Sequence, residues 1–207
     1  MEELNDFFRY GHHEAIVTSM NMRGKVNIAP MGVDLHREYL VLKPFTNTET
    51  FKNILEVKEA VINLTNDSII FYNALLSKEN LKFVPSKKVK PPRIDGYVDY
   101  YIECTVEGIN LDKEKLRAIV FLKPVYIEKG KGSSMAYSRS NSFIIEMLIY
   151  FTKVKAFIDL GNVSGAYKAL QEVVNYYIKI TRLGSPKIIE IAKDILNRSL
   201  RLCLNSH

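Results

Sequence analysis

The sequence changes its periodicity once, near residue 130, and this change constrains the fold more than any other feature. Before it, short stretches rich in Val, Ile, Tyr and Phe alternate with turn residues, which is typical of antiparallel β-strands. After the Gly- and Ser-containing stretch 129–134, apolar residues recur every three to four positions, as in amphipathic helices. We therefore expect an α+β protein with an antiparallel β-barrel at residues 1–130 and a three-helix module at residues 131–207.

The β-rich part contains six candidate strands, and three of them are joined by short turns that predict an antiparallel meander. Pro30 has no N–H group to donate, so the strand that contains it should lie at a sheet edge or be bulged there. The sequence pattern fits a helix and a strand equally well at 68–73, whereas the polar, Pro-rich stretch 77–96 predicts a surface loop. The candidate strands are 14–20, 25–35, 38–43, 59–65, 97–109 and 116–127.

Helix signals occur at both ends of the chain and once inside the β-rich part. Residues Thr46-Asn-Thr-Glu49 fit a capping box, which predicts a helix that Thr46 caps and that carries apolar residues from Phe51 onward. Residues 1–11 predict a short helix with Leu4, Phe7 and Phe8 on one side. The C-terminal module predicts helices at 141–158, after Ser164, and after Ser185 with Pro186 at the first helical position.

Composition and cysteine usage exclude several classes of protein. Hydrophobic residues make up 47% and charged residues 25% of the chain, so a disordered chain is excluded. Cys104 and Cys203 are far apart and form no CxxC pair, so we expect two reduced thiols in the cytoplasm and neither a disulfide framework nor a metal site. The N-terminus lacks the apolar core of a signal peptide, and no apolar run approaches the roughly 20 residues of a membrane span.

No motif for side-chain catalysis is present. None of the four histidines lies in a nucleophile or zinc-protease motif, and the chain has neither a Walker A nor a GxGxxG loop. We therefore predict no catalytic side chain and no metal site, and the usual dinucleotide and nucleoside-triphosphate folds are excluded. The net charge of +6 fits a partner that is an anion.

Two polar stretches remain as candidates for a binding site, at residues 17–32 and 43–53. The second places three threonines, Thr46, Thr48 and Thr50, at the start of the predicted helix. Free backbone N–H groups, the positive end of the helix dipole and several hydroxyls would meet there, which suits a phosphate. The alternative is that Thr46 only caps the helix while Thr48 and Thr50 face solvent.

These two stretches resemble the FMN-binding split-barrel flavoproteins, in which a small polar pair, a turn and Asn-x-Ala-Pro lie along the flavin. The matching residues are Val17-Thr-Ser-Met20, Gly24 and Asn27-Ile-Ala-Pro-Met-Gly32. The chain is most similar to an uncharacterised, mostly archaeal family of this fold with a C-terminal helical module. That family shares Pro-Phe/Tyr-x-x-Thr-x-Thr-x-x-Asn and Val-x-Asn-x-Thr-x-Asp, present here as Pro44, Phe45, Thr48, Thr50 and Asn53, then Val61, Asn63, Thr65 and Asp67. Ser19 replaces a usual Thr, and Ser138 and Ser140 replace the Asn and Ala around Arg139.

The resemblance implies that the cofactor is FMN and that the chain forms a homodimer with the flavin near the interface. It implies one wall of the site from Thr18, Ser19 and Met20 and another from Asn27, Ala29, Pro30 and Met31. It assigns the phosphate and ribityl chain to Thr46, Thr48, Thr50 and Asn53. Because flavin itself supplies redox chemistry, the implied function is an FMN-dependent oxidoreductase or flavin reductase-like protein that uses a small-molecule electron donor or acceptor.

Two other functions remain open at this stage. A nucleic-acid-binding β-barrel would account for the net charge and for the basic stretch Lys87–Arg93, although that stretch lacks the interleaved aromatic residues of a nucleic-acid strip, so nucleic acid is not the expected partner. A flavin carrier or sensor without catalysis of its own would use the same residues as the enzyme.

Overall fold

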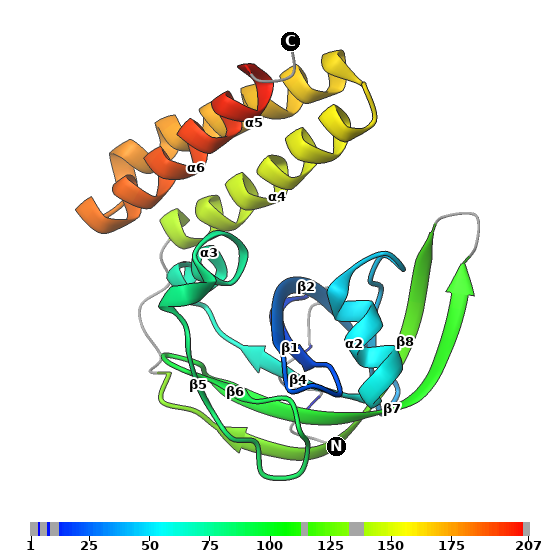
Figure 1. Ribbon diagram of the computed structural model, residues 1–207. Helices are drawn as coiled ribbons and strands as arrows, with labels where there is room; N and C mark the ends of the chain where they lie inside the picture. Colours follow the sequence, from blue (N-terminus) through cyan, green and yellow to red (C-terminus); the bar gives the residue numbers. More distant parts are fainter. Residues whose placement is uncertain (1–3, 5–7, 9–12, 113–115, 133–138, 205–207) are drawn as a thin grey trace. The chain divides into compact units, whose positions relative to one another are not determined.

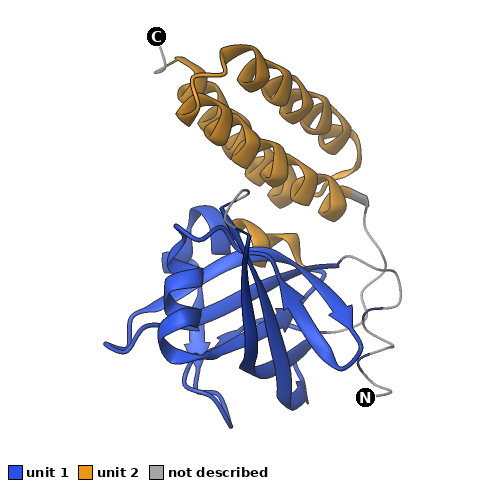
Figure 2. Ribbon diagram, turned by 90° about the vertical axis from the view of Figure 1, so that its right-hand side faces the viewer, with its two compact units in different colours: residues 1–66, 73–134 blue, residues 67–72, 135–207 orange. Residues whose placement is uncertain are grey.

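The computed structural model describes residues 4, 8, 13–112, 116–132 and 139–204. It divides into two compact units, shown in different colours in Figure 2: residues 1–66 with 73–134, and residues 67–72 with 135–207. We call them the barrel unit and the helical unit. The division into domains at residues 130 and 131 stays a prediction, because compactness does not test whether either part folds alone.

The barrel unit is a closed six-stranded antiparallel barrel with the strand order β1-β2-β3-β8-β7-β4 (Figure 1). Together with the helices it makes the protein α+β, as the sequence predicts. All six candidate strands are present, and the last two begin and end one to three residues later than predicted. The strands are β1 His13–Met20, β2 Val26–His36, β3 Tyr39–Leu42, β4 Glu59–Leu64, β7 Tyr100–Asp112 and β8 Arg117–Lys129.

Helix α2 (Glu49–Val57) packs onto the barrel core through Phe51 and Ile54. Leu4 and Phe8 are also buried in this core; the rest of the helix predicted over residues 1–11, including Phe7, lies outside the described residues. Fully burying a side chain such as Phe51 or Ile54 contributes about 1.5–3 kcal/mol. The core therefore fixes where the first turn of α2 meets the strands.

Pro30 lies at a position of β2 that suits a residue without an N–H group. β2 pairs with β1 along the whole of β1, with Pro30 opposite Ile16. β2 pairs with β3 only over Val33–His36, so at Pro30 the strand has a neighbour on one side alone. The missing N–H group thus falls on a local edge, which confirms the first of the two predicted alternatives.

The prediction that Thr46 caps the helix is wrong. Thr48 is the N-cap: its Oγ1 accepts a hydrogen bond from the Phe51 amide at 3.3 Å and donates one to the Phe45 carbonyl at 2.7 Å. Thr46 instead donates from both its amide (3.0 Å) and its hydroxyl (3.2 Å) to the Leu116 carbonyl. This tertiary contact with the chain just before β8 holds Thr46 outside the helix, so the helix starts two residues later than the local pattern indicates.

The prediction of a loop over 77–96 is wrong in part. The stretch contains a 3₁₀ helix, η1 (Lys78–Asn80), and a two-stranded sheet of β5 (Lys82–Val84) and β6 (Arg93–Asp95). Its connecting segment 85–92 is held by carboxylates of the barrel: Glu103 accepts from the amides of Lys87 (2.8 Å) and Lys88 (2.6 Å), and Glu59 accepts from the amide of Lys90 (2.7 Å). Backbone groups that a solvated loop would offer to water are therefore paired.

Residues 68–73, which fitted a helix and a strand equally, lie in helix α3 (Ser68–Leu76). The first part of α3 belongs to the helical unit and the rest to the barrel unit. Two side chains of its first part bond within the helical unit: Ser68 Oγ donates to Asn141, and the Tyr72 hydroxyl donates to Asp194.

The helical unit contains α4 (Arg139–Asp159), α5 (Val163–Leu183) and α6 (Pro186–Leu204). Pro186 is the first residue of α6, and Ser185 Oγ accepts from the Ile188 amide at 3.5 Å, as the sequence predicts. α5 begins before Ser164 because Asn162 is its cap, accepting from the Gly165 amide at 2.9 Å. Among the described residues, no helix is both long and apolar enough to cross a membrane.

Candidate functional site

The strand pair β1–β2 carries most of the predicted site residues, and its register decides which of them can meet. Ser19 lies opposite Asn27, and Thr18 lies opposite Ile28. Because side chains alternate along a strand, Ser19 points to the face that Ala15 and Val17 share with the barrel core, whereas Thr18 points to the other face. We call these the inner and outer faces of the β1–β2 pair.

Four predicted residues meet on the inner face. Asn53 Nδ2 donates to Ser19 Oγ at 3.3 Å, and Asn27 Nδ2 donates to Thr50 Oγ1 at 2.9 Å. The two bonds join residues 34 and 23 positions apart and fix the first turns of α2 against the end of the strand pair. We call Ser19, Asn27, Thr50 and Asn53 the inner cluster.

Most of the inner cluster is buried. Ser19 is 0%, Thr50 2% and Asn53 4% exposed, while Asn27 is half-buried. Within the described part of the chain, the hydroxyls of Ser19 and Thr50 accept these bonds but donate none, although each has a proton to give. The cluster is therefore internally paired yet keeps unused donor capacity.

Thr18 belongs to a separate network on the outer face. Its hydroxyl donates to the Pro92 carbonyl at 2.6 Å and accepts from Asn63 Nδ2 at 3.4 Å. Asn63 also donates to the Ile16 carbonyl (2.9 Å) and accepts from the Ile94 amide (3.1 Å). The Thr18 side chain is thus taken up by the structure, and only the backbone of Thr18 remains for a ligand. We call Thr18 and Asn63, with the backbone that they bind, the outer cluster.

A buried ion pair joins strands β6, β7 and β8; we call this region the outer flank of the barrel. Glu103, fully buried, has its Oε1 3.9 Å from Arg93 Nε, and Arg93 Nη1 lies 2.9 Å from Glu128 Oε2. The Tyr126 hydroxyl donates to Glu128 at 2.9 Å, and this bond, followed by Arg93, lowers the pKa of Glu128. The charges of this flank compensate one another and help to position segment 85–92 and β6, although Arg93 Nε and Nη1 form no hydrogen bond within the described residues.

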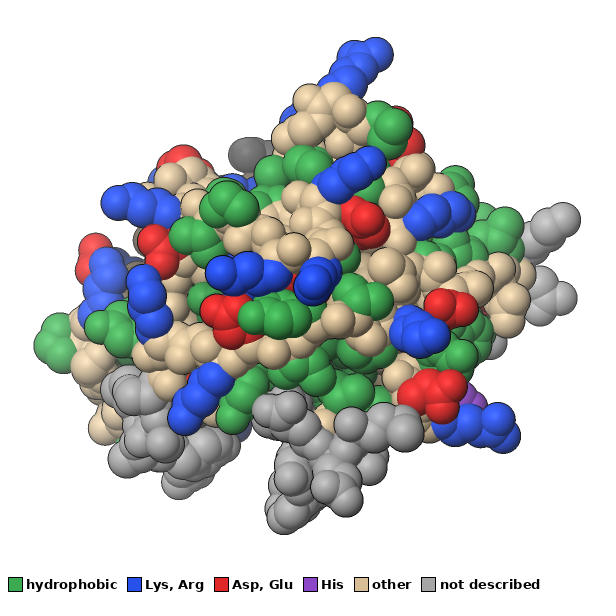
Figure 3. Space-filling model, turned by 90° about the horizontal axis from the view of Figure 1, so that it is seen from below, with side chains coloured by type: hydrophobic (Ala, Val, Ile, Leu, Met, Phe, Trp, Pro, Cys, Tyr) green, Lys and Arg blue, Asp and Glu red, His purple; other side chains and the backbone are tan. Residues whose placement is uncertain are grey.

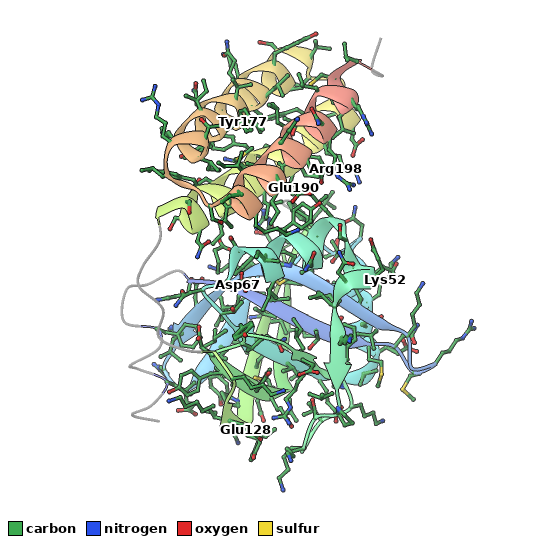
Figure 4. All side chains as sticks on the ribbon, turned by 90° about the vertical axis from the view of Figure 1, so that its left-hand side faces the viewer. Lys52, Asp67, Glu128, Tyr177, Glu190 and Arg198 are labelled. Atoms are coloured by element: carbon green, nitrogen blue, oxygen red, sulfur yellow. The ribbon has the colours of Figure 1, made fainter. Side chains whose placement is uncertain are left out.

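The start of α2 offers two backbone donors. In the described residues the amides of Glu49 and Thr50 make no hydrogen bond, as expected for the first turn of a helix. Lys52, labelled in Figure 4, binds Glu49 Oε1 at 2.9 Å, and this bond and charge, with a smaller contribution from Lys25, lower the pKa of Glu49. The Lys52 ammonium is thus already paired, and the carboxylate at the helix start is compensated.

The predicted apolar residues are divided between the two faces. Met20, Ala29, Pro30 and Met31 are all half-buried. Alternation places Ala29 and Met31 with Asn27 on the inner face, where Met31 packs against the core, and Met20 and Pro30 on the outer face. Thr46 and Thr48, also half-buried, lie just before α2 with the hydrogen bonds already described.

Sequence reasoning missed Lys78. Its Nζ donates to Asn27 Oδ1 at 3.2 Å, which adds an ammonium to the inner cluster. No local signal could have found it, because Lys78 lies in the polar stretch that predicted a loop.

The remaining chemistry-bearing groups that the structure describes form no second site. Burial raises the pKa of the Cys104 thiol far above its usual range, so this core cysteine is not a nucleophile. No group of three His, Cys, Asp or Glu side chains within the described residues could hold a metal ion. On the described part of the face in Figure 3, basic side chains are interspersed with acidic and hydrophobic ones rather than forming a continuous strip.

Comparison with known proteins identifies the fold. A sequence model of the family described as "Protein of unknown function (DUF447) N-terminal domain" matches residues 13–131. No curated protein is similar enough to count as a match.

Solved structures similar to the chain include the following three. An FMN-bound protein from Methanosarcina mazei, described under the same family, is 18% identical, with a TM-score of 0.77 over 94% of this chain and 99% of that one. A 2-nitrobenzoate 2-nitroreductase from Pseudomonas fluorescens is 23% identical (TM-score 0.50, 62% and 73% covered). A split-barrel protein from Shewanella frigidimarina, assigned as a flavin reductase, is 12% identical (TM-score 0.53, 61% and 71% covered). The split-barrel fold predicted from the sequence is confirmed.

Proposed function

The chain belongs to the DUF447 family, whose N-terminal domain it carries at residues 13–131, and from this premise we propose that it is an FMN-binding flavoprotein with oxidoreductase activity. The observation that carries the proposal is the match, over nearly the full length of both chains, to a protein of the same family that binds FMN. The nitroreductase and flavin-reductase descriptions of the other two structures support a redox role.

The hydrogen-bond donors at the start of α2 in the barrel unit suit the phosphate of FMN. A phosphate dianion needs several hydrogen-bond donors, and the amides of Glu49 and Thr50 and the Thr50 hydroxyl have unused donor capacity at the start of α2. Thr46 and Thr48, whose hydroxyls donate to the Leu116 and Phe45 carbonyls, would fix the first turn of α2 for the phosphate. Asn53, held by Ser19, completes the residues proposed for the phosphate and ribityl chain. Asn27 and the half-buried residues Met20, Ala29, Pro30 and Met31 are proposed to contact the ring, together with the backbone of Thr18 and Ser19.

When bound, FMN supplies the redox chemistry. The side chains of this chain would bind and orient the cofactor, and none of those proposed for the site is required as a general acid or base. The electron donor and acceptor would be small molecules. Turnover of NAD(P)H by the purified, FMN-loaded protein is the expected result for an enzyme, and FMN binding without any turnover would favour a carrier or sensor instead.

We also propose that the chain forms a homodimer with the flavin near the interface. Exposed apolar side chains lie close to the start of α2: Phe45 is 48% and Leu116 66% exposed, and the two segments are joined by hydrogen bonds between Thr46 and Leu116. A second copy of the chain would remove these side chains from water, which favours contact there. Light scattering coupled to size-exclusion chromatography should give about twice the chain mass, and a monomer that binds FMN fully would contradict this part of the proposal.

The decisive experiment is the absorption spectrum of the purified protein. We expect a yellow protein with the flavin bands and release of FMN on denaturation, or stoichiometric binding on titration of a colourless preparation with FMN. A colourless protein that binds no FMN would overturn the proposed function.

A paired variant tests where the phosphate binds. Replacing Thr48→Ala together with Thr50→Ala should weaken FMN binding by about 1–3 kcal/mol, because the Thr50 donor to a charged group is lost and the cap that fixes the first turn of α2 is removed. Thr48 is also the helix cap, so folding must be checked by urea denaturation. The matched control is Thr152→Ala with Thr181→Ala, two exposed threonines of the helical unit, and equal affinity of the two double variants would move the phosphate away from α2.

A further inference from the structure

Lys78 contacts the inner cluster from outside the sequence motifs. It is the first residue of η1, and its ammonium donates to Asn27 Oδ1 at 3.2 Å. Asn27 uses its amide nitrogen to bind Thr50 Oγ1 at 2.9 Å, so one side chain separates the cation from the first turn of α2. An ammonium has three N–H donors, and the contact with Asn27 occupies one of them.

Among the described residues, no carboxylate forms an ion pair with Lys78. By contrast, Lys52 binds Glu49 at 2.9 Å and Lys43 binds Asp34 at 2.8 Å. Lys78 is exposed as a residue, yet partial burial of its ammonium lowers its pKa. A cation that loses solvent without gaining a carboxylate is unfavourable unless an anion compensates it.

The phosphate is the charged part of FMN, whose ring and ribityl chain are neutral. A lysine ammonium is a compact point charge that suits a phosphate and adds little to the recognition of a neutral ring edge. The residues around Lys78 that are already proposed for FMN, Asn27 and Thr50, are amide and hydroxyl groups without charge. Asn27 and Thr50 therefore supply no positive charge to the phosphate.

We propose that Lys78 is a binding residue for the phosphate of the flavin and that Asn27 holds its ammonium in place by the 3.2 Å hydrogen bond. This inference rests on the proposed FMN binding. It adds a residue that distinguishes FMN from riboflavin, which has the same ring and ribityl chain without the phosphate.

The experiment compares the two flavins. Dissociation constants for FMN and for riboflavin are measured by fluorescence quenching with the full-length protein, Lys78→Met, Lys78→Gln and Lys82→Met. Lys82 lies four residues away at the start of β5 and is exposed, so Lys82→Met matches the change in net charge. Lys78→Gln removes the charge but keeps a hydrogen-bond donor, which guards against a folding defect specific to Met.

We expect both Lys78 variants to bind FMN about tenfold more weakly and riboflavin as tightly as the parent chain, with Lys82→Met unchanged for both. The salt dependence of FMN binding should also decrease in the Lys78 variants. Parent-like FMN affinity in both Lys78 variants, or an equal loss for FMN and riboflavin, would overturn the inference while FMN binding stands. A parent chain that binds neither flavin would overturn the proposed function itself.

Discussion

The inner and outer faces of the β1–β2 pair are both polar, but they differ in whether their hydrogen-bonding groups are used up. On the outer face, Thr18 and Asn63 bind backbone groups of Ile16, Pro92 and Ile94. On the inner face, the buried hydroxyls of Ser19 and Thr50 accept bonds without donating any within the described chain, and the cluster ends at the ammonium of Lys78.

The difference teaches how neighbouring residues of one motif come to have different tasks. Thr18 and Ser19 are adjacent, and the alternation of the strand sends one to each face. A fully paired polar cluster contributes to stability, because removing one partner leaves another buried group without a bond. A cluster with spare donors beside an unpaired cation has capacity left for a ligand. Changes on the outer face should therefore alter stability, and changes on the inner face should alter affinity for FMN.

The strongest test of this contrast is Glu103→Ala on the flank that carries the outer face. It should lower the free energy of unfolding by about 3–5 kcal/mol, because buried Arg93 loses a carboxylate and the amides of Lys87 and Lys88 lose their acceptor. Urea denaturation measures the loss, and Glu107→Ala, an exposed β7 carboxylate 4.0 Å from Lys123, is the control with a change of at most about 1 kcal/mol. Loss of FMN affinity in folded Glu103→Ala would contradict the separation of the faces.

Thr18→Val should have the next largest effect. The substitution keeps the shape of the side chain but leaves the Pro92 carbonyl without its donor, at a cost of about 1–2 kcal/mol in stability. FMN affinity should stay within twofold of the parent, since only the backbone of Thr18 is proposed to meet the ligand. A parent-like stability with weakened FMN binding would place the Thr18 hydroxyl in the site after all.

Thr50→Val is the matched change on the inner face. It removes the acceptor for Asn27 Nδ2 and a spare donor at the start of α2, so FMN should bind about fivefold more weakly, or about 1 kcal/mol. Titration of Thr18→Val and Thr50→Val side by side gives the comparison directly. Equal FMN affinities in these two valine variants would remove the distinction between the faces.

The smallest expected effect concerns acid stability of the outer flank. The hydrogen bond from Tyr126, followed by Arg93, lowers the pKa of Glu128 from its ordinary value of 4.5. A lowered carboxyl pKa stabilises the fold above pH 4.5, and this contribution is lost as the pH falls through the lowered value. Tyr126→Phe should therefore reduce the urea midpoint at pH 7, and the difference from the parent should narrow at pH 3. A difference that is the same at both values would assign the effect to packing of the ring instead.

The sequence predicted most clearly those features that depend on local chemistry. Pro30 restricts its strand wherever the strand lies, so its edge position could be foreseen. Ser185 and Pro186 mark a helix start by their own geometry. The division of Thr18 and Ser19 between two faces was also available, because alternation follows once a strand is predicted.

The errors arose where distant residues decide the structure. Thr46 has the residue type and spacing of a cap, but the Leu116 carbonyl, 70 positions away, binds it outside the helix. The stretch 77–96 is polar and Pro-rich, yet Glu59 and Glu103 pair its amides. Lys78 could not be found for the same reason, since only the folded chain brings it to Asn27, 51 positions earlier.

Two contacts of helix α3 can form only late in the synthesis of the chain. Ser68 and Tyr72 leave the ribosome early, but the residues that bind them, Asn141 and Asp194, follow 73 and 122 positions later. A nascent chain that has completed β8 therefore has a barrel whose strands can all pair, while the first turns of α3 still lack the partners that they bind in the finished protein. A chain that is cut after β8 would lack Asn141 and Asp194 permanently, and the first turns of its α3 would never form these two hydrogen bonds.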